Sequence, residues 1–165
     1  MKINYTPGPL LDASRTTPTA LWNDSADLDE LRQSIAFGGV GATCNPVIGY
    51  TTIKKHPDIW EDRIRAIAEN NPTWGESQIG WQAIKDMSVE AAKLLEPIFV
   101  EHKGRNGRLS IQTDPRLHRD AKALADQAEE FSNLAPNIIV KIPCTSVGIE
   151  AVSYTHLTLP TTPYV

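Results

Sequence analysis

The sequence predicts an α/β fold in which strands and helices alternate and the strands form a parallel sheet. One observation is the apolar, β-branched run at residues 137–145, which is bounded by turn-forming residues and is typical of a strand buried on both faces. Another is the helical periodicity of residues 114–133, which separates this run from a shorter apolar stretch, as in a parallel crossover. In addition, 165 residues with 41% apolar and 22% charged composition are sufficient for one globular domain with a core.

The first part of the chain is predicted to form a β-α-β unit. Residues 1–17 contain no periodic pattern, and we expect an irregular lead-in there. Residues 19–23 are predicted to form a short strand, and Asp27 is a suitable N-cap for the amphipathic helix that follows. Residues 40–44 give a second strand. Asn45, which is followed by proline, begins another helix, because proline fits the first helical turn.

The second part of the chain repeats the order of strand and helix. It opens with a long helical region, which has apolar faces at residues 59–67 and 84–95 and an interruption at Pro72. Residues 109–112 form the third predicted strand, and Asp114, again followed by proline, indicates the start of a helix. The apolar face of that helix consists of Leu117, Ala121, Leu124, Ala128 and Phe131. The helix delivers the chain to the fourth strand.

Charge and composition narrow the classes of partner. The formal net charge is -4 at pH 7, with lysine and arginine dispersed, which argues against a nucleic-acid surface or a polybasic membrane contact. The longest apolar runs are too short to span a bilayer, and the N-terminus has no apolar core of signal-peptide length. Two cysteines cannot build a disulfide framework. We therefore expect a cytoplasmic protein that acts on a small molecule.

Lys141 stands out because it lies inside the apolar run at residues 137–145. Burial in a medium of low dielectric disfavours an ammonium, and the neutral amine that results can attack a carbonyl. This makes Lys141 a candidate Schiff-base nucleophile. The alternative is that Lys141 lies at an edge or at the end of a strand with its head in water, because lysine is rarely buried unless it is paired.

The four predicted strands end in polar residues, and the carboxyl ends of parallel strands carry the chemistry in α/β proteins. These residues are Asp24, Asn45, Gln112 and Lys141. Each has an ordinary alternative, since Asp24 also suits a turn or cap, Asn45 an Asx-turn and Gln112 a surface amide. Their shared placement favours a site, because a lysine that forms an imine needs a proton donor and acceptor and an amide nearby.

Three motifs in this order resemble those of transaldolases. Residues 41–46 (GATCNP) resemble the Thr-Thr-Asn-Pro signature, residues 107–114 (GRLSIQTD) the third-strand motif, and residues 137–149 (NIIVKIPCTSVGI) the active-site lysine motif. The resemblance extends from about Thr16 to Ala151. It implies a (β/α)8 TIM-type barrel of which this chain contains only the first four strands and their helices.

The resemblance also implies roles for individual residues. Lys141 would form the Schiff base with a ketose phosphate, and Asp24 would be the acid/base that assists carbon-carbon cleavage. Asn45, together with Thr43 of the same motif, would bind the dihydroxyacetone portion of the substrate. The implied activity is that of a transaldolase of the pentose phosphate pathway, which acts on sugar phosphates and uses neither a metal ion nor an organic cofactor.

Gln112 departs from the pattern. Most transaldolases have a glutamate at this place in the third strand, where it works through a water molecule. An amide does not exchange a proton at neutral pH, although it still orients water. Related fructose 6-phosphate aldolases resemble this chain at Gln112. Simple aldol cleavage therefore stays open as an alternative to transfer.

The last 14 residues, 152–165, do not continue the pattern. A helix is expected to open after residues 148–151, yet VSYTHLTLPTTPYV contains four threonines and two prolines and no helical period. Residues 152–156 resemble the translation of a transposon-type sequencing adapter. We therefore expect residues 1–151 to be the N-terminal half of the barrel and 152–165 a non-native tail, the alternative being a genuine threonine-rich tail. A third possibility is that the chain is a fragment without activity.

Overall fold

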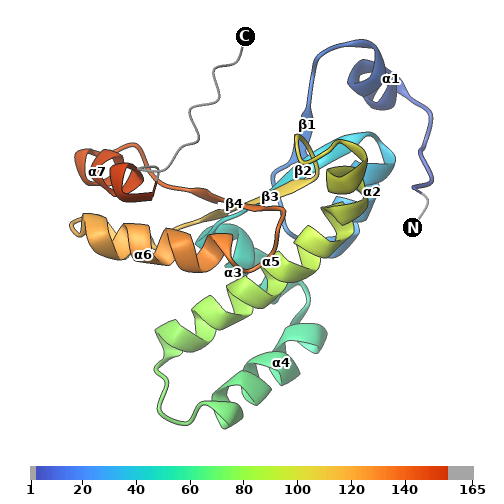
Figure 1. Ribbon diagram of the computed structural model, residues 1–165. Helices are drawn as coiled ribbons and strands as arrows, with labels where there is room; N and C mark the ends of the chain where they lie inside the picture. The colour runs from blue at the N-terminus through green and yellow to red at the C-terminus, as the bar shows by residue number, and fades with distance from the viewer. Residues whose placement is uncertain (1–2, 156–165) are drawn as a thin grey trace.

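The computed structural model describes residues 3–155, which form a four-stranded parallel sheet with helices packed on one side (Figure 1). The strands are β1 (Leu21–Asn23), β2 (Gly39–Cys44), β3 (Arg108–Gln112) and β4 (Ile138–Lys141), and they lie in this order across the sheet. The helices are α1 (Pro9–Thr16), α2 (Leu28–Ala36), α3 (Pro46–Lys55), α4 (Pro57–Asn70), α5 (Glu76–Glu101), the 3₁₀ turn η1 (Pro115–Leu117), α6 (Ala121–Ser132) and α7 (Ser146–Thr155). The predicted α/β class and the alternation of strands and helices are confirmed.

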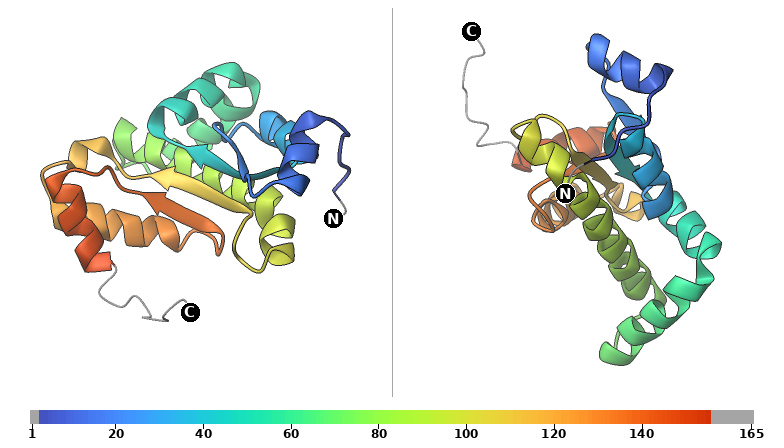
Figure 2. Two further views of the ribbon diagram at one scale, coloured as in Figure 1. Left: turned by 90° about the horizontal axis from the view of Figure 1, so that it is seen from above. Right: turned by 90° about the vertical axis from the view of Figure 1, so that its right-hand side faces the viewer.

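The register of the strands gives the sheet two different faces. Residues that pair across parallel strands share a face, and successive residues along a strand alternate between faces. Ala42, Leu109 and Ile138 are paired in register and buried, and they belong to the main apolar core. The opposite face carries polar and half-buried residues. In Figure 2 (left) the sheet lies in front of α5 and α6, and the helices therefore cover the apolar face.

Two of the helices begin where they were predicted to begin, and each has a capping side chain. The Asp27 carboxylate accepts hydrogen bonds from the backbone N–H groups of Asp29 and Glu30 at the start of α2. The Asn45 Oδ1 does the same for Val47 and Ile48 at the start of α3, with proline in the first turn. Both local predictions are confirmed.

The helix predicted from Asp114 begins later than expected. Asp114 caps only the 3₁₀ turn η1, and α6 starts at Ala121 with Asp120 as its N-cap. The Asp120 side chain accepts a hydrogen bond from the Ala123 N–H, which opens a second helix in a new direction. Leu117 therefore lies outside the α-helix, contrary to the prediction.

The lead-in and the long helical region also contain more structure than the sequence indicated. Residues 9–16 form α1, a short amphipathic helix with proline in its first turn and one buried residue, Leu11. The region between β2 and β3 contains three helices, α3, α4 and α5. Helices α4 and α5 run side by side at the end that extends beyond the sheet, while the rest of α5 packs against β2 and β3 (Figure 1 and Figure 2, right).

Strand β4 is less buried than the sequence predicted. Only Ile138 is fully buried, Ile139 and Val140 are half-buried, and Lys141 is exposed. The reason is tertiary, because β4 lies at the edge of the sheet and pairs only with β3 among the described residues. The prediction of a strand buried on both faces is therefore wrong for this chain, and the exposed strand end that was the alternative describes Lys141.

Helix α7 crosses the boundary predicted at residue 151. It continues through Thr155, and the side chains of Val152, Ser153 and Tyr154 are exposed. The remaining residues of the predicted tail, 156–165, lie outside the described part of the chain. Within residues 3–155, no helix has the length and apolar character that a bilayer span requires.

Candidate active site

The polar strand ends singled out in the sequence lie together at one edge of the sheet. Asp24 follows β1, Asn45 follows β2, and Gln112 and Lys141 are the last residues of β3 and β4. Neighbouring strands are about 4.8 Å apart, so adjacent members of the set are within reach of one small ligand. The alternation of side chains places Thr43, Gln112 and Lys141 on the face opposite the buried core.

Asp24 and Thr43 are joined directly. The Thr43 Oγ1 donates a hydrogen bond to the Asp24 Oδ1 over 2.5 Å, and this contact links the ends of β1 and β2. Thr43 is half-buried and Asp24 is exposed. A carboxylate held in one orientation by a neighbouring hydroxyl and open to solvent is suited to exchanging protons with a bound ligand.

Asn45 has a structural task in addition to the predicted one. Its Oδ1 caps α3, accepting from two backbone N–H groups at 2.9 Å, so the carbonyl oxygen of the side chain is already engaged. The Asn45 amide N–H groups are the part of the side chain that the cap does not use. The Asx-type alternative considered for this residue and a ligand-binding role are compatible in one side chain.

Gln112 and Lys141 are direct neighbours. They are register partners on β3 and β4, and the backbone N–H of Thr113 donates to the carbonyl oxygen of Lys141 over 3.2 Å. Gln112 is half-buried and Lys141 is exposed. An amide and an amine thus lie beside each other on the open face.

A second set of charged residues, missed in the sequence, anchors the loop that carries Asp24. The Asp27 side chain is only 2% exposed, and its Oδ2 accepts a hydrogen bond from Lys55 Nζ at 3.0 Å and lies 2.7 Å from His56 Nε2. Burial alone would raise the pKa of Asp27, but hydrogen bonds from the Glu30 N–H, Lys55 and His56 outweigh it and hold that pKa well below its usual range. The end of α3 thereby fixes a residue three positions after Asp24.

Asp114 and Arg116 form another ion pair beyond the end of β3. Arg116 Nε donates to Asp114 Oδ1 at 2.9 Å, Trp81 Nε1 donates to Asp114 Oδ2 at 2.9 Å, and a second guanidinium nitrogen donates to Ser77 Oγ at 2.6 Å. Burial opposes the charge of Asp114, but the hydrogen bonds from Arg116 lower its pKa overall. Arg116 is therefore committed to fixing the loop after β3.

Metal ligation has no geometric support within residues 3–155, where no three or more His, Cys, Asp or Glu side chains form a group able to hold an ion. The groups at this edge of the sheet are an amine, a carboxylate, a hydroxyl and two amides, of which Asp24 and Thr43 form one adjacent pair and Gln112 and Lys141 another. Such a set suits covalent catalysis by an amine, with proton transfer by a carboxylate.

Comparison with known proteins gives the same family that the motifs resemble. Residues 21–156 match the family model described as Transaldolase/Fructose-6-phosphate aldolase. The chain is 34% identical over 118 residues to Transaldolase 2 of Streptomyces avermitilis, a match that covers 69% of this chain and 30% of the relative. It is 32% identical over 140 residues to the transaldolase of Thiobacillus denitrificans, with 80% of this chain and 38% of the relative covered. For the transaldolase of Kocuria rhizophila the identity is 30% over 156 residues, with coverage of 85% and 42%.

Coverage of these relatives is partial. The chain spans between 30% and 42% of the length of the three relatives. The matched region nevertheless contains all five residues singled out at the strand ends, from Asp24 to Lys141.

Proposed function

Because the chain belongs to the transaldolase/fructose-6-phosphate aldolase family, we propose that the whole protein transfers a dihydroxyacetone unit between sugar phosphates through an imine on Lys141. The donor would be a ketose phosphate such as fructose 6-phosphate, and the acceptor an aldose phosphate such as erythrose 4-phosphate. This is the chemistry of the pentose phosphate pathway. The observation that carries the proposal is the placement of Lys141 beside Gln112, on the face that also presents Thr43.

The proposed reaction begins at the lysine. The neutral Lys141 amine adds to the ketone carbon of the donor, and loss of water with uptake of one proton from solvent leaves a protonated imine. The imine accepts the electron pair of the carbon-carbon bond that breaks, while the Asp24 carboxylate takes the proton from the hydroxyl that becomes the departing aldehyde. The bound enamine then attacks the aldehyde of the acceptor, and Asp24 returns its proton. Water hydrolyses the new protonated imine and releases the new ketose, the free amine and the proton taken up from solvent.

The other strand-end residues would bind and orient. Thr43 keeps the Asp24 carboxylate in one orientation through the 2.5 Å hydrogen bond. The amide N–H groups of Asn45 are available to hydroxyl oxygens of the dihydroxyacetone portion, since the Asn45 Oδ1 is occupied at the start of α3. Gln112 would orient the water molecule that leaves when the imine forms and the one that later cleaves it.

Borohydride trapping tests the lysine. The test protein consists of residues 1–151 continued by the second half of a transaldolase, and we call it the extended protein. Reduction in the presence of fructose 6-phosphate should attach a sugar-derived mass to Lys141, because an imine is reduced to a stable amine. Lys141→Met should abolish both labelling and turnover. Labelling at Lys54, Lys55 or Lys85 instead would refute the assignment.

Simple aldol cleavage is the second candidate, and Gln112 is the observation that favours it. An amide at this position does not exchange protons at neutral pH, and the family description covers fructose 6-phosphate aldolases as well as transaldolases. Turnover of fructose 6-phosphate by the extended protein should be measured with and without erythrose 4-phosphate. Transfer requires the acceptor, whereas an aldolase releases dihydroxyacetone without it.

A further inference from the structure

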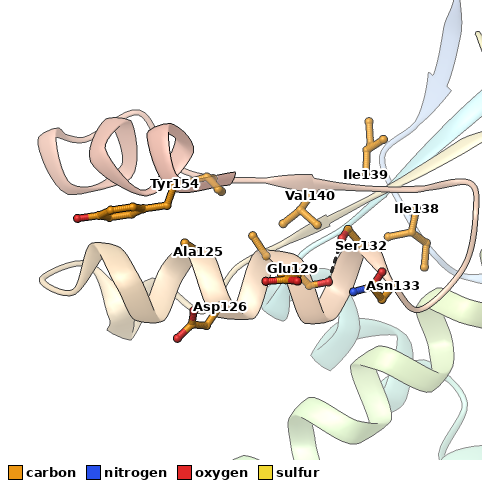
Figure 3. Close-up of a pocket in the computed structure, with 11 residues that line it drawn as sticks. Ala125, Asp126, Glu129, Ser132, Asn133, Ile138, Ile139, Val140 and Tyr154 are labelled. Atoms are coloured by element: carbon orange, nitrogen blue, oxygen red, sulfur yellow. Dashed lines mark hydrogen bonds between the residues drawn. The ribbon is translucent and has the colours of Figure 1, made fainter. Parts of the chain in front are cut away.

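A small pocket separates α3 from the loop of residues 24–27, which carries Asp24. The pocket has a volume of about 220 Å³ and is lined by Asp24 and Ser25 of the loop and by Thr51 and Lys55 of α3, among others. A pocket of about 700 Å³ between α6, β4 and α7 is lined by none of the strand-end residues (Figure 3). Because the space between Asp24 and α3 is open, packing against α3 does not hold Asp24 in place.

Short-range hydrogen bonds give the loop its shape. The Asn23 Nδ2 donates to the carbonyl oxygen of Ser25 at 2.8 Å, and the backbone N–H of Asp27 donates to Ser25 Oγ at 3.1 Å. Each of these bonds joins residues that are two positions apart in the sequence. They therefore do not set the orientation of the loop relative to β2 and α3.

Hydrogen bonds at the two ends of the loop connect it to β2 and to α3. At its start, Thr43 Oγ1 of β2 donates to Asp24 Oδ1. At its end, Asp27 Oδ2 accepts from Lys55 Nζ at 3.0 Å and lies 2.7 Å from His56 Nε2. Within residues 3–155, these contacts of Asp27 are the hydrogen bonds between the loop and the C-terminal end of α3. The position of the loop beside α3 therefore depends on Asp27.

Lys55 is suited to hold Asp27 because its ammonium group bridges two carboxylates at the start of α2. Its Nζ lies 3.0 Å from Asp27 Oδ2 and 2.8 Å from Glu30 Oε1. The hydrogen bonds with Glu30 and Asp27 raise the pKa of Lys55, so the amine stays charged at neutral pH. The Asp27 side chain is 2% exposed, and a buried carboxylate that loses its cation is strongly destabilised. The loop is therefore favoured where Lys55 reaches it.

We propose that Lys55 is a positioning residue that acts through Asp27 on the Asp24 carboxylate. The inference rests on the proposed function, in which Asp24 takes and returns the proton of the reacting hydroxyl. Thr43 binds one oxygen of Asp24, and one hydrogen bond leaves the carboxylate free to turn about it. Asp27, three residues further on, fixes the backbone that carries Asp24. Misplacing a reacting group by about 1 Å costs on the order of 10²-fold in rate.

The proposal places the effect of Lys55 in one step of the reaction. Imine formation uses the Lys141 amine, whereas breaking the carbon-carbon bond uses the Asp24 carboxylate. A displaced Asp24 should therefore slow cleavage without slowing imine formation. Ala26 in the middle of the loop is fully buried in the main core, so the loop should shift and stay folded when Lys55 is replaced.

The test compares two adducts on the same lysine of the extended protein. Fructose 6-phosphate is added without an acceptor, and borohydride is added within the first turnover. Mass spectrometry then distinguishes the uncleaved six-carbon adduct on Lys141 from the three-carbon adduct that remains after cleavage. The ratio of the two adducts counts only molecules that have formed the imine, so a smaller folded fraction does not change it.

The variants are Lys55→Met, Lys55→Arg and the matched control Lys54→Met. Lys55→Met should raise the ratio of six-carbon to three-carbon adduct at least tenfold, with the rate of labelling unchanged within twofold. Lys55→Arg should restore most of the cleavage, because a guanidinium also donates to two carboxylates. Lys54 is the exposed neighbouring residue, and its ammonium lies 5.3 Å from the centre of the Tyr50 ring. Lys54→Met should therefore give the ratio of the unchanged protein.

An unchanged adduct ratio in Lys55→Met would overturn the inference and leave the proposed function intact. Loss of both adducts from a Lys55→Met protein that is folded by circular dichroism would also overturn it, because Lys55 would then serve imine formation. An equal change in Lys54→Met would show a general effect of surface charge, against the inference.

A second variant keeps the test decisive if Lys55→Met does not fold. His56→Phe removes the other partner of Asp27 Oδ2, and it should raise the same adduct ratio. An unchanged ratio in a folded His56→Phe protein would overturn the inference. Absence of any adduct on Lys141 in the unchanged extended protein would refute the proposed function, and the inference with it.

Discussion

Gln112 and Lys141 are register partners at the ends of β3 and β4, on the face of the sheet that the helices leave open. The backbone holds the two residues beside each other, since the N–H of Thr113 donates a hydrogen bond to the carbonyl oxygen of Lys141 at 3.2 Å. The amide and the amine therefore lie close enough to contact one small ligand. Adjacent strands bring their side chains within about 5 Å of each other.

Replacing Gln112 with glutamate tests this relationship. If the Gln112 amide orients water without exchanging a proton, Gln112→Glu in the extended protein should keep at least a tenth of the turnover and still form the imine. A free glutamate side chain titrates near pH 4.3 and an amide does not. The pH profile of kcat/KM for the variant should therefore show one more transition at acidic pH than the profile of the unchanged protein. The readout is a pH profile of both proteins with borohydride trapping beside it. A fully active variant with an unaltered profile would place the position outside the path of the proton.

The buried Asp27 carboxylate gives a prediction for stability. Asp27→Asn removes a carboxylate charge that is 2% exposed and that caps α2 and pairs with Lys55 and His56. The free energy of unfolding should therefore fall by about 2–4 kcal/mol. The pKa of Asp27 is lowered in the folded state, so its contribution is complete above the unfolded value near 4 and is lost as the pH falls through the folded value. Urea unfolding at pH 7 and pH 3 measures both effects.

The control for Asp27 is Asp29 in the first turn of the same helix. The Asp29 side chain is 71% exposed and pairs with Arg32 at the surface, so Asp29→Asn should change stability by less than about 0.5 kcal/mol. The difference in the free energy of unfolding between the unchanged protein and Asp27→Asn should be smaller at pH 3 than at pH 7. An equal difference at both pH values would contradict the assignment of the effect to the carboxylate charge.

Gly107, at the start of the third-strand motif, gives a prediction about packing. Its φ is 75°, and a Cβ there would lie 2.1 Å from the backbone nitrogen of Phe99 in α5. Gly107→Ala should therefore destabilise the protein by about 3 kcal/mol or more, because backbone has to move. Gly80→Ala is the matched control, since nothing lies within 4 Å of its Cβ position in α5, and it should stabilise by about 0.5–1 kcal/mol. Thermal unfolding of both variants measures the contrast, and equal effects would contradict the close approach of β3 to α5.

Local patterns in the sequence predict the strands, their parallel order and the starts of two helices. Asp27 was identified as a cap, and the start of α3 from the proline after Asn45, because a capping residue and the backbone N–H groups that donate to it are neighbours in sequence. The burial of β4 on both faces was predicted incorrectly, whereas the alternative of an exposed Lys141 at the strand end was right, because burial depends on what covers β4, which is a tertiary property. The late start of α6 has a similar cause, since Asp114 and Asp120 are both suitable caps and packing decides between them.

The candidate site shows the same division. The strand-end positions of Asp24, Gln112 and Lys141 follow from the alternation of strand and helix, so they were predictable without a structure. The anchoring of Asp27 by Lys55 and His56 was not, because those partners are 28 and 29 residues away and no local period connects them. The hydrogen bond from Thr43 to Asp24 spans 19 residues and appears only when β1 and β2 pair.

The 165-residue chain alone should have no measurable transaldolase activity. Barrels of this architecture place a phosphate site in the loops after their last strands, and this chain covers only 30–42% of the three relatives. Binding energy from the phosphate, which does not react, positions the ketone against the lysine. Turnover of fructose 6-phosphate with erythrose 4-phosphate should therefore appear in the extended protein and be absent from the 165-residue chain, assayed at equal concentration.

Lys141→Met in the extended protein is the control for contaminating activity. Turnover by the 165-residue chain that is lost in its own Lys141→Met variant would show that these four strands suffice for catalysis.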